Sequence, residues 1–169
     1  MTRKTGLALV GILLAFGLIW GCGQGSLSTK EINTEKIATK FHKEVVRGGY
    51  QVVTTPELKK WIDEKKDMLI IDTMPYEASY KKNHIPGAKQ FLFPIPEMKE
   101  MSDAKKAAFI KLLGDNKDKV LVFYCGFVKC TRSHNGAMWA RKLGYKNVYR
   151  YPGGIKAWME AGYPVAKAK

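Results

Sequence analysis

The chain has 169 residues, enough for one domain with a proper hydrophobic core and short appendages. Its 29 Lys and Arg residues outnumber its 15 Asp and Glu residues, which gives a formal net charge of +14. The basic residues are spread along the chain, no run interleaves them with aromatic residues, and no nucleic-acid-binding motif occurs. We therefore expect no nucleic-acid partner. Small anionic substrates or an anionic membrane surface account for the charge equally well.

Residues 1–21 have the pattern of a bacterial lipoprotein signal peptide. Two basic residues precede an apolar run over residues 7–20, and the run ends at Gly21-Cys22. We expect cleavage before Cys22 and a lipid on that cysteine. The mature protein would then be anchored in the bacterial cell envelope on its non-cytoplasmic side, periplasmic or extracellular. An uncleaved membrane anchor and a soluble secreted product are the alternatives, although the run is short for a spanning helix.

Residues 22–48 predict a polar tether followed by an amphipathic helix, which two consecutive glycines end. Ile37, Phe41 and Val45 recur at helical spacing and form its apolar stripe. We interpret this helix as packing on the flank of the domain, with a partner-binding helix as the alternative. The domain itself is expected to span residues 49–166.

Within the domain, apolar strands alternate with amphipathic helices. Pro56 suits the first turn of a helix, and Pro94 and Pro96 prevent a strand from continuing through them. Strands that alternate with helices predict an α/β fold with a parallel sheet of about five strands. The expected strands are 50–53, 68–71, 90–93, 120–124 and 148–151, and the expected helices are one from Pro56, Met98–Leu113, one capped by Ser133, and Gly154–Ala161.

The most informative stretch is residues 120–141. It opens with five apolar residues without polar alternation, which is typical of a strand buried on both faces of a parallel sheet. Cys125 stands where this strand ends. Ser133 is a good N-cap residue for the helix that follows. The pattern therefore places a cysteine in a loop between the carboxyl end of a strand and the start of a helix.

Such a position favours a reactive thiol. Backbone N–H groups and the positive end of the helix dipole converge there, and Lys129 and Arg132 add positive charge. We expect this environment to lower the pKa of Cys125 and to bind anions. The alternative is a buried, inert cysteine that simply ends a strand.

Three separated motifs, taken together and in order, resemble those of the rhodanese-like sulfurtransferases, and the resemblance covers Tyr50 to Val165. It implies a rhodanese-like domain, with a parallel sheet that has helices on both faces. The motifs are Asp72 with Tyr80–Ala88 (YKKNHIPGA), Tyr124-Cys125…Arg132-Ser133 with Gly144-Tyr145, and Asn147–Val165 with its Gly153-Gly154 and Ala157-Trp158 pairs.

The resemblance implies that Cys125 is the nucleophile of a sulfurtransferase. Its thiolate would take the outer sulfur of an anionic donor such as thiosulfate, sulfite would leave, and a thiol or other nucleophilic acceptor would then remove the sulfur from the persulfide. No cofactor is expected, and two cysteines are too few for a zinc site. The donor would be held by the loop residues Gly126, Phe127, Val128, Lys129, Cys130, Thr131 and Arg132.

The chain departs from the family pattern at three points. Met74 stands where an Arg is usual, and the segment Asp72–His84 is one residue longer than common. Six residues separate Cys125 from Arg132, where the sulfurtransferase pattern has four. Related phosphatases and arsenate reductases on this fold have five, and Thr131 occupies the position of their Arg. The donor therefore stays open at this point.

Cys130 is a thiol that the common family pattern does not require. In an oxidising compartment it can pair with Cys125, and we expect it to act as a resolving thiol that closes a disulfide with Cys125. A small residue that merely lines the loop is the alternative. Three functions remain open: a persulfide-forming sulfurtransferase, a thiol–disulfide or oxyanion reductase that uses Cys125 and Cys130, and a non-catalytic tethered binding module.

Overall fold

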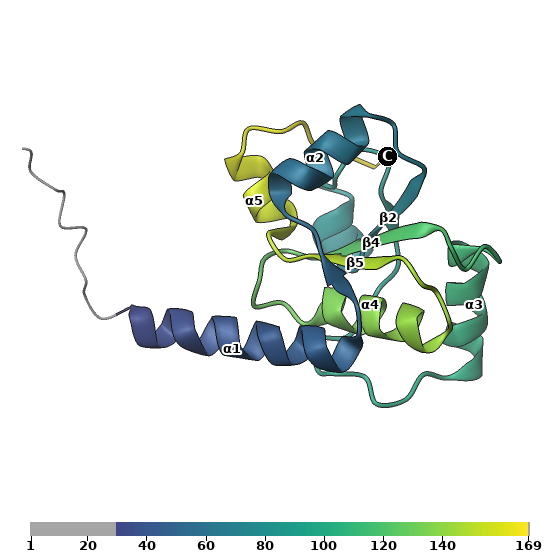
Figure 1. Ribbon diagram of the computed structural model, residues 1–169. Coiled ribbons are helices and arrows are strands. Elements are labelled where there is room, and N and C mark those ends of the chain that lie inside the picture. The colour runs from purple at the N-terminus through teal and green to yellow at the C-terminus, as the bar shows by residue number, and fades with distance from the viewer. Residues whose placement is uncertain (1–29, 169) are drawn as a thin grey trace, which may run out of the picture.

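A computed structural model describes residues 30–168 of the chain. Five strands form one sheet in the order β1-β5-β4-β2-β3, and every neighbouring pair is parallel (Figure 1). The prediction of an α/β fold with a parallel sheet of about five strands is confirmed. The strands are β1 (Gln51–Val52), β2 (Met68–Asp72), β3 (Lys89–Gln90), β4 (Val120–Tyr124) and β5 (Val148–Tyr151).

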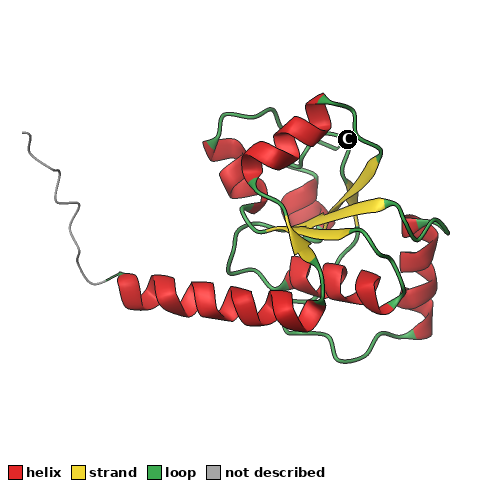
Figure 2. Cartoon of the chain, viewed as in Figure 1, coloured by secondary structure: helices red, strands yellow, loops and turns green. Residues whose placement is uncertain are grey.

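Helices cover both faces of the sheet, as expected (Figure 2). Helices α2 and α5 lie over one face, whereas α1, α3 and α4 lie over the other (Figure 1). The helices are α1 (Glu31–Gly48), α2 (Thr55–Asp63), α3 (Asp103–Leu113), α4 (Arg132–Lys142) and α5 (Gly154–Glu160), with one π-helical turn, η1 (Tyr76–Tyr80).

The predicted signal peptide (residues 1–21), the predicted lipidation site Cys22 and the tether that follows it lie outside the described residues. Among the helices of residues 30–168, none combines the length and the apolar character that crossing a bilayer requires.

The side chains of β4 alternate between two apolar cores. Val122 and Tyr124 join the core beneath α2 and α5, whereas Leu121 and Phe123 join the core beneath α3 and α4. All four side chains are fully buried. Successive residues of a strand point to opposite faces, so a strand covered on both faces needs an unbroken apolar run.

Several element boundaries differ from the predictions, and the start of α3 differs most. The helix predicted from Met98 begins only at Asp103, because Ser102 caps it by accepting the N–H of Lys105. The N–H of Met98 instead donates to Oδ1 of Asn135, at 2.8 Å. Met98 is therefore bound to α4, and the residues from Met98 to Met101 precede α3 without being part of it.

The third strand is also shorter and earlier than predicted. β3 consists of Lys89 and Gln90, whereas the prediction placed the strand at residues 90–93. The chain beyond it still runs along β2, since the N–H groups of Phe91 and Phe93 donate to carbonyl oxygens at residues 72 and 73. This pairing ends at Phe93, directly before Pro94.

The extra residue between Asp72 and His84 is absorbed by η1. The N–H of Tyr80 donates to the Pro75 carbonyl and that of Lys81 to the Tyr76 carbonyl, both five residues back. A π-helical turn holds one residue more than an α-helical turn. The longer segment therefore fits without disturbing the strands on either side.

Candidate functional site

Cys125 directly follows β4, and only 2% of its surface is exposed. Its carbonyl oxygen accepts the N–H of Ile155 at 2.9 Å, which fixes the start of the reactive loop (residues 125–132) against α5. This close approach needs a glycine at position 154, because a Cβ there would collide with the Cys125 carbonyl, and Gly154 has a φ of +62°. The start of α5 thus holds the strand-end position of Cys125.

Cys130 lies in the same loop but is only half-buried. It lines an open cavity of about 280 Å³, which we call the thiol cavity. Cys125 is not among the residues that line it. A molecule that enters from solvent therefore meets the sulfur of Cys130 first. The lining residues are Met74, Pro75, Ile95, Gly126, Phe127, Lys129, Cys130 and Arg132.

The surroundings of Cys125 favour its protonated form. Its Sγ lies 3.2 Å from the carbonyl oxygen of Cys130, and a carbonyl only accepts hydrogen bonds. Burial raises the pKa of the Cys125 thiol well above its ordinary value, and the neighbouring Cys130 raises it further. The expectation that the strand-end position lowers the pKa of Cys125 is therefore wrong for this arrangement of the loop, because desolvation outweighs the nearby Ser133 groups.

The surroundings of Cys130 favour the thiolate. The hydrogen bond from the Cys125 thiol, the backbone N–H groups of Arg132 and Gly126 and the charge of Arg132 lower the pKa of Cys130 to about 6, against the opposing effect of burial. Two backbone N–H groups of the loop thus face the sulfur of Cys130. Both cysteines are free in this structure.

Ser133 has a role other than the predicted one. Helix α4 begins at Arg132, its N-cap is Thr131, and no side chain makes a capping hydrogen bond. Ser133 is buried in the first turn, where its Oγ accepts the Nε–H of Arg150 at 3.0 Å and lies 3.3 Å from Cys125 Sγ. The hydroxyl therefore connects the buried thiol to a guanidinium from β5.

Arg150 is the functional residue that the sequence analysis missed. Its side chain is fully buried, and its guanidinium donates to the carbonyl oxygens of Cys130 at 3.0 Å and Val128 at 3.3 Å. It also forms an ion pair of 2.6 Å with the buried carboxylate of Glu44 in α1. The Arg150 guanidinium thus binds two carbonyl groups of the loop and, through its contact with Ser133, one hydroxyl group of α4. The sequence did offer a signal. Arg150 and Glu44 are charged residues at positions where the strand and helix patterns predict apolar side chains.

The structure separates the predicted loop residues into two groups. Five of the seven predicted donor-binding residues line the thiol cavity, including Lys129 and Arg132. The Arg132 guanidinium also donates to the Phe93 carbonyl, which holds it beside the cavity. Val128 and Thr131 do not line it. The hydroxyl of Thr131 turns toward α1 instead, where the Lys40 ammonium group lies 3.3 Å away.

Met74, at the usual family Arg position, forms an apolar wall of the thiol cavity. It is buried, and its N–H donates to Oδ1 of Asp72 at 2.8 Å. Oδ2 of Asp72 has no hydrogen-bond partner among the described residues. Burial raises the pKa of Asp72 to about 6, more than its hydrogen bonds lower it. Within residues 30–168, no three His, Cys, Asp or Glu side chains are grouped so that they could hold a metal ion.

Comparisons with known proteins agree with this architecture. The family model of the rhodanese-like domain matches residues 54–161. No curated protein matches the chain. Among solved structures, the BH2092 protein from Bacillus halodurans is 25% identical, with a TM-score of 0.55 and coverage of 80% of this chain and 87% of that chain.

Two further structures share the fold at lower identity. The polysulfide-sulfur transferase homodimer from Wolinella succinogenes is 15% identical, with a TM-score of 0.56 and coverage of 84% of this chain and 95% of that chain. The thiosulfate sulfurtransferase from Pseudomonas aeruginosa is 18% identical, with a TM-score of 0.57 and coverage of 79% of this chain and 23% of that chain.

Proposed function

Because the chain belongs to the rhodanese-like domain family, we propose that it is a sulfurtransferase that moves sulfane sulfur from an anionic donor such as thiosulfate to an acceptor thiol. The observation that carries this proposal is the pair Cys125 and Cys130, with one sulfur open to a cavity that Lys129 and Arg132 line. The Wolinella and Pseudomonas proteins are named as sulfur transferases, which supports the same class of reaction here.

In the first half-reaction a cysteine thiolate attacks the outer sulfur of the donor. A sulfur–sulfur bond forms, the bond to sulfite breaks, and sulfite leaves with the electron pair. The sequence predicts Cys125 as the attacking thiol, and this stays a prediction. The structure favours Cys130 for the first attack, because Cys130 lines the thiol cavity and its thiol has a lowered pKa, whereas Cys125 is buried and has a raised pKa. We therefore propose that Cys130 attacks the donor first and carries the persulfide.

In the second half-reaction an acceptor thiolate attacks the outer sulfur of the persulfide and restores the Cys130 thiolate. Cys125 offers a competing step. Its thiol can attack the inner sulfur, which closes a Cys125–Cys130 disulfide and releases hydrogen sulfide. The resolving role predicted for Cys130 then belongs to Cys125. An external thiol must reduce this disulfide before the next cycle.

A thiol–disulfide or oxyanion reductase is the second candidate function. The same two neighbouring thiols favour it, because a lowered pKa on the accessible cysteine and a buried partner are what disulfide exchange requires. This function differs from sulfur transfer in its products. A reductase passes two electrons to its substrate and is itself oxidised to the disulfide, whereas sulfur transfer releases sulfite from thiosulfate.

The test is sulfite release from thiosulfate by the full chain, with dithiothreitol as the acceptor thiol. We expect saturable kinetics, and we expect Arg132→Ala to raise KM about tenfold or more with a smaller effect on kcat, because the guanidinium lines the cavity beside the donor's charge. Absence of sulfite release by the reduced protein at any thiosulfate concentration would overturn the proposal. It would leave the reductase or a non-catalytic binding module.

We also propose that the protein works in the bacterial cell envelope, tethered by the lipid predicted on Cys22 on the non-cytoplasmic side. The basic, apolar and Gly-Cys sequence of residues 1–22 supports this placement. The proposed partners are thus a small anionic sulfur donor, an acceptor thiol and the membrane, and no nucleic acid.

A further inference from the structure

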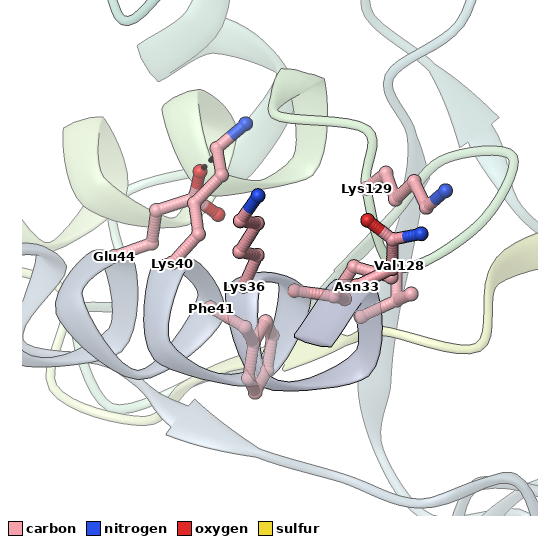
Figure 3. Close-up of a pocket in the computed structure, with 8 residues that line it drawn as sticks. Asn33, Lys36, Lys40, Phe41, Glu44, Val128 and Lys129 are labelled. Carbon is pink, nitrogen blue, oxygen red and sulfur yellow. Dashed lines mark ion pairs between the residues drawn. The ribbon is translucent and has the colours of Figure 1, made fainter. Parts of the chain in front are cut away.

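A second open cavity, of about 400 Å³, lies between α1 and the reactive loop. Figure 3 shows that its walls come from two separate parts of the chain, the α1 helix and the loop. Helix α1 precedes the residues that the family model matches, so one wall of this cavity lies outside the matched region. We call it the helix cavity. It is lined by Asn33, Lys36, Ile37, Lys40, Phe41 and Glu44 of α1 and by Val128 and Lys129 of the loop.

The helix cavity carries uncompensated positive charge. Its one carboxylate, Glu44, lies 2.6 Å from the buried Arg150 guanidinium and 3.7 Å from the Lys40 ammonium group, so these three groups already compensate one another in part. The ammonium groups of Lys36 and Lys129 have no hydrogen-bond or ion-pair partner among residues 30–168. Figure 3 shows the Lys36 side chain rising from α1 and Lys129 extending from the loop on the other side.

Apolar side chains complete the cavity. Ile37, Phe41 and Val128 also line it, and the Asn33 side chain adds an amide. An inorganic anion would leave this apolar surface uncovered. A flat apolar molecule without charge would leave both ammonium groups unpaired. The lining therefore matches a molecule with an apolar body and acidic groups at two ends.

We propose that the helix cavity binds a small organic dianion and that this binding weakens the hold of the thiol cavity on anions. Lys129 lines both cavities, so its ammonium group can neutralise a charge in only one of them at a time. An anion in the helix cavity draws Lys129 away from the thiol cavity and leaves Arg132 as the remaining cation beside Cys130. The site is distinct from the sulfur-transfer chemistry, and its occupancy can be measured without any turnover.

The first measurement is binding of naphthalene-1,5-disulfonate to the full, reduced protein by isothermal titration calorimetry. This probe has an apolar ring system with a sulfonate at each end. We expect one saturable site, with affinity reduced about tenfold by Lys36→Gln, because this variant removes one of the two cations that would pair with the sulfonates. Lys43→Gln is the matched control, since Lys43 is exposed on α1, outside the cavity, and loses the same charge.

The second measurement tests the link between the two cavities. Cys130 is alkylated with anionic iodoacetate and with neutral iodoacetamide, and the labelled peptide is quantified by mass spectrometry. Saturating probe should slow iodoacetate at least threefold relative to iodoacetamide, since only the charged reagent depends on Lys129. Equal weakening of probe binding by Lys36→Gln and Lys43→Gln, absence of saturable binding, or an unchanged reagent ratio at saturation would each overturn the proposal.

Discussion

The carboxylate of Glu44 in α1 and the guanidinium of Arg150 in β5 form a buried ion pair, with Oε2 and Nη1 2.6 Å apart. The two residues are 106 positions apart in the sequence. Arg150 extends the connection to the loop through the carbonyl of Cys130 and to α4 through the hydroxyl of Ser133. An N-terminal helix outside the matched family region thus takes part in positioning the reactive loop.

Removing the charge of Glu44 should destabilise the fold strongly. Glu44→Gln leaves the Arg150 guanidinium buried without its counter-ion, and breaking a buried pair in this way typically costs about 3–5 kcal/mol. Urea denaturation measures the free energy of unfolding. Arg47→Gln is the control, because it removes an ion pair of the same 2.6 Å distance that is largely exposed, worth about 0–1 kcal/mol. Equal losses in the two variants would contradict the role given to the buried pair.

The reactivity of Cys130 should follow a thiolate of low pKa. We expect its alkylation by iodoacetamide to rise as pH increases through about 6, because the thiolate is the reacting form and it predominates above that pKa. Cys125→Ala removes the thiol that donates to Cys130 and should shift the rise to higher pH. A wild-type alkylation rate that rises only above about pH 8 would contradict the low pKa of Cys130. The same pH profile in both proteins would contradict the contribution of Cys125 to that pKa.

The buried Asp72 should make the protein less stable as pH rises. Its folded pKa of about 6 lies above the unfolded value of 3.8, so the folded state binds the proton more tightly and loses stability between about pH 4 and 7. The difference between these two pKa values corresponds to about 3 kcal/mol. Asp72→Asn should remove this part of the pH dependence of the unfolding free energy. Asp67→Asn, at an exposed carboxylate, should retain it, and an unchanged dependence in Asp72→Asn would refute the assignment.

The predicted lipid anchor has a simple test in the cell. Cys22→Ser removes the acylated residue, so we expect the protein to leave the membrane fraction or to accumulate with its signal peptide uncleaved. One lipidated cysteine carries several acyl chains, and two or more chains suffice for stable anchoring. Fractionation and N-terminal mass measurement follow the outcome. Normal maturation together with unchanged membrane association would rule the anchor out.

Much of the fold could be predicted from the sequence because its determinants are local. The apolar run before Cys125 marks a strand covered on both faces, and the prolines and glycines mark the turns. The start of α3 was missed because two competing signals, an apolar Met98 and the N-cap Ser102, lie four residues apart. The contact of Met98 with Asn135 decided between them.

The chemistry of the site was predicted less completely, because it depends on contacts between distant segments. The sequence identifies two thiols in one loop, but their exposure follows from how Arg150 and α5 hold the loop carbonyls. Those contacts bury Cys125 and turn Cys130 toward the cavity. Arg150 and Glu44 were overlooked for the same reason. Each interrupts an apolar pattern, and only the pairing of the two explains why a charge is there.

The position of the transferred sulfur tests the central claim most directly. The reduced protein is treated briefly with thiosulfate, and peptide mass spectrometry locates the added sulfur in the wild type and in the Cys125→Ser and Cys130→Ser variants. We predict one added sulfur on Cys130 in the wild type and in Cys125→Ser, and little or none on Cys125 in Cys130→Ser. A persulfide on Cys125 that forms at the wild-type rate without Cys130, and is lost in Cys125→Ser, would contradict this order and restore Cys125 as the nucleophile.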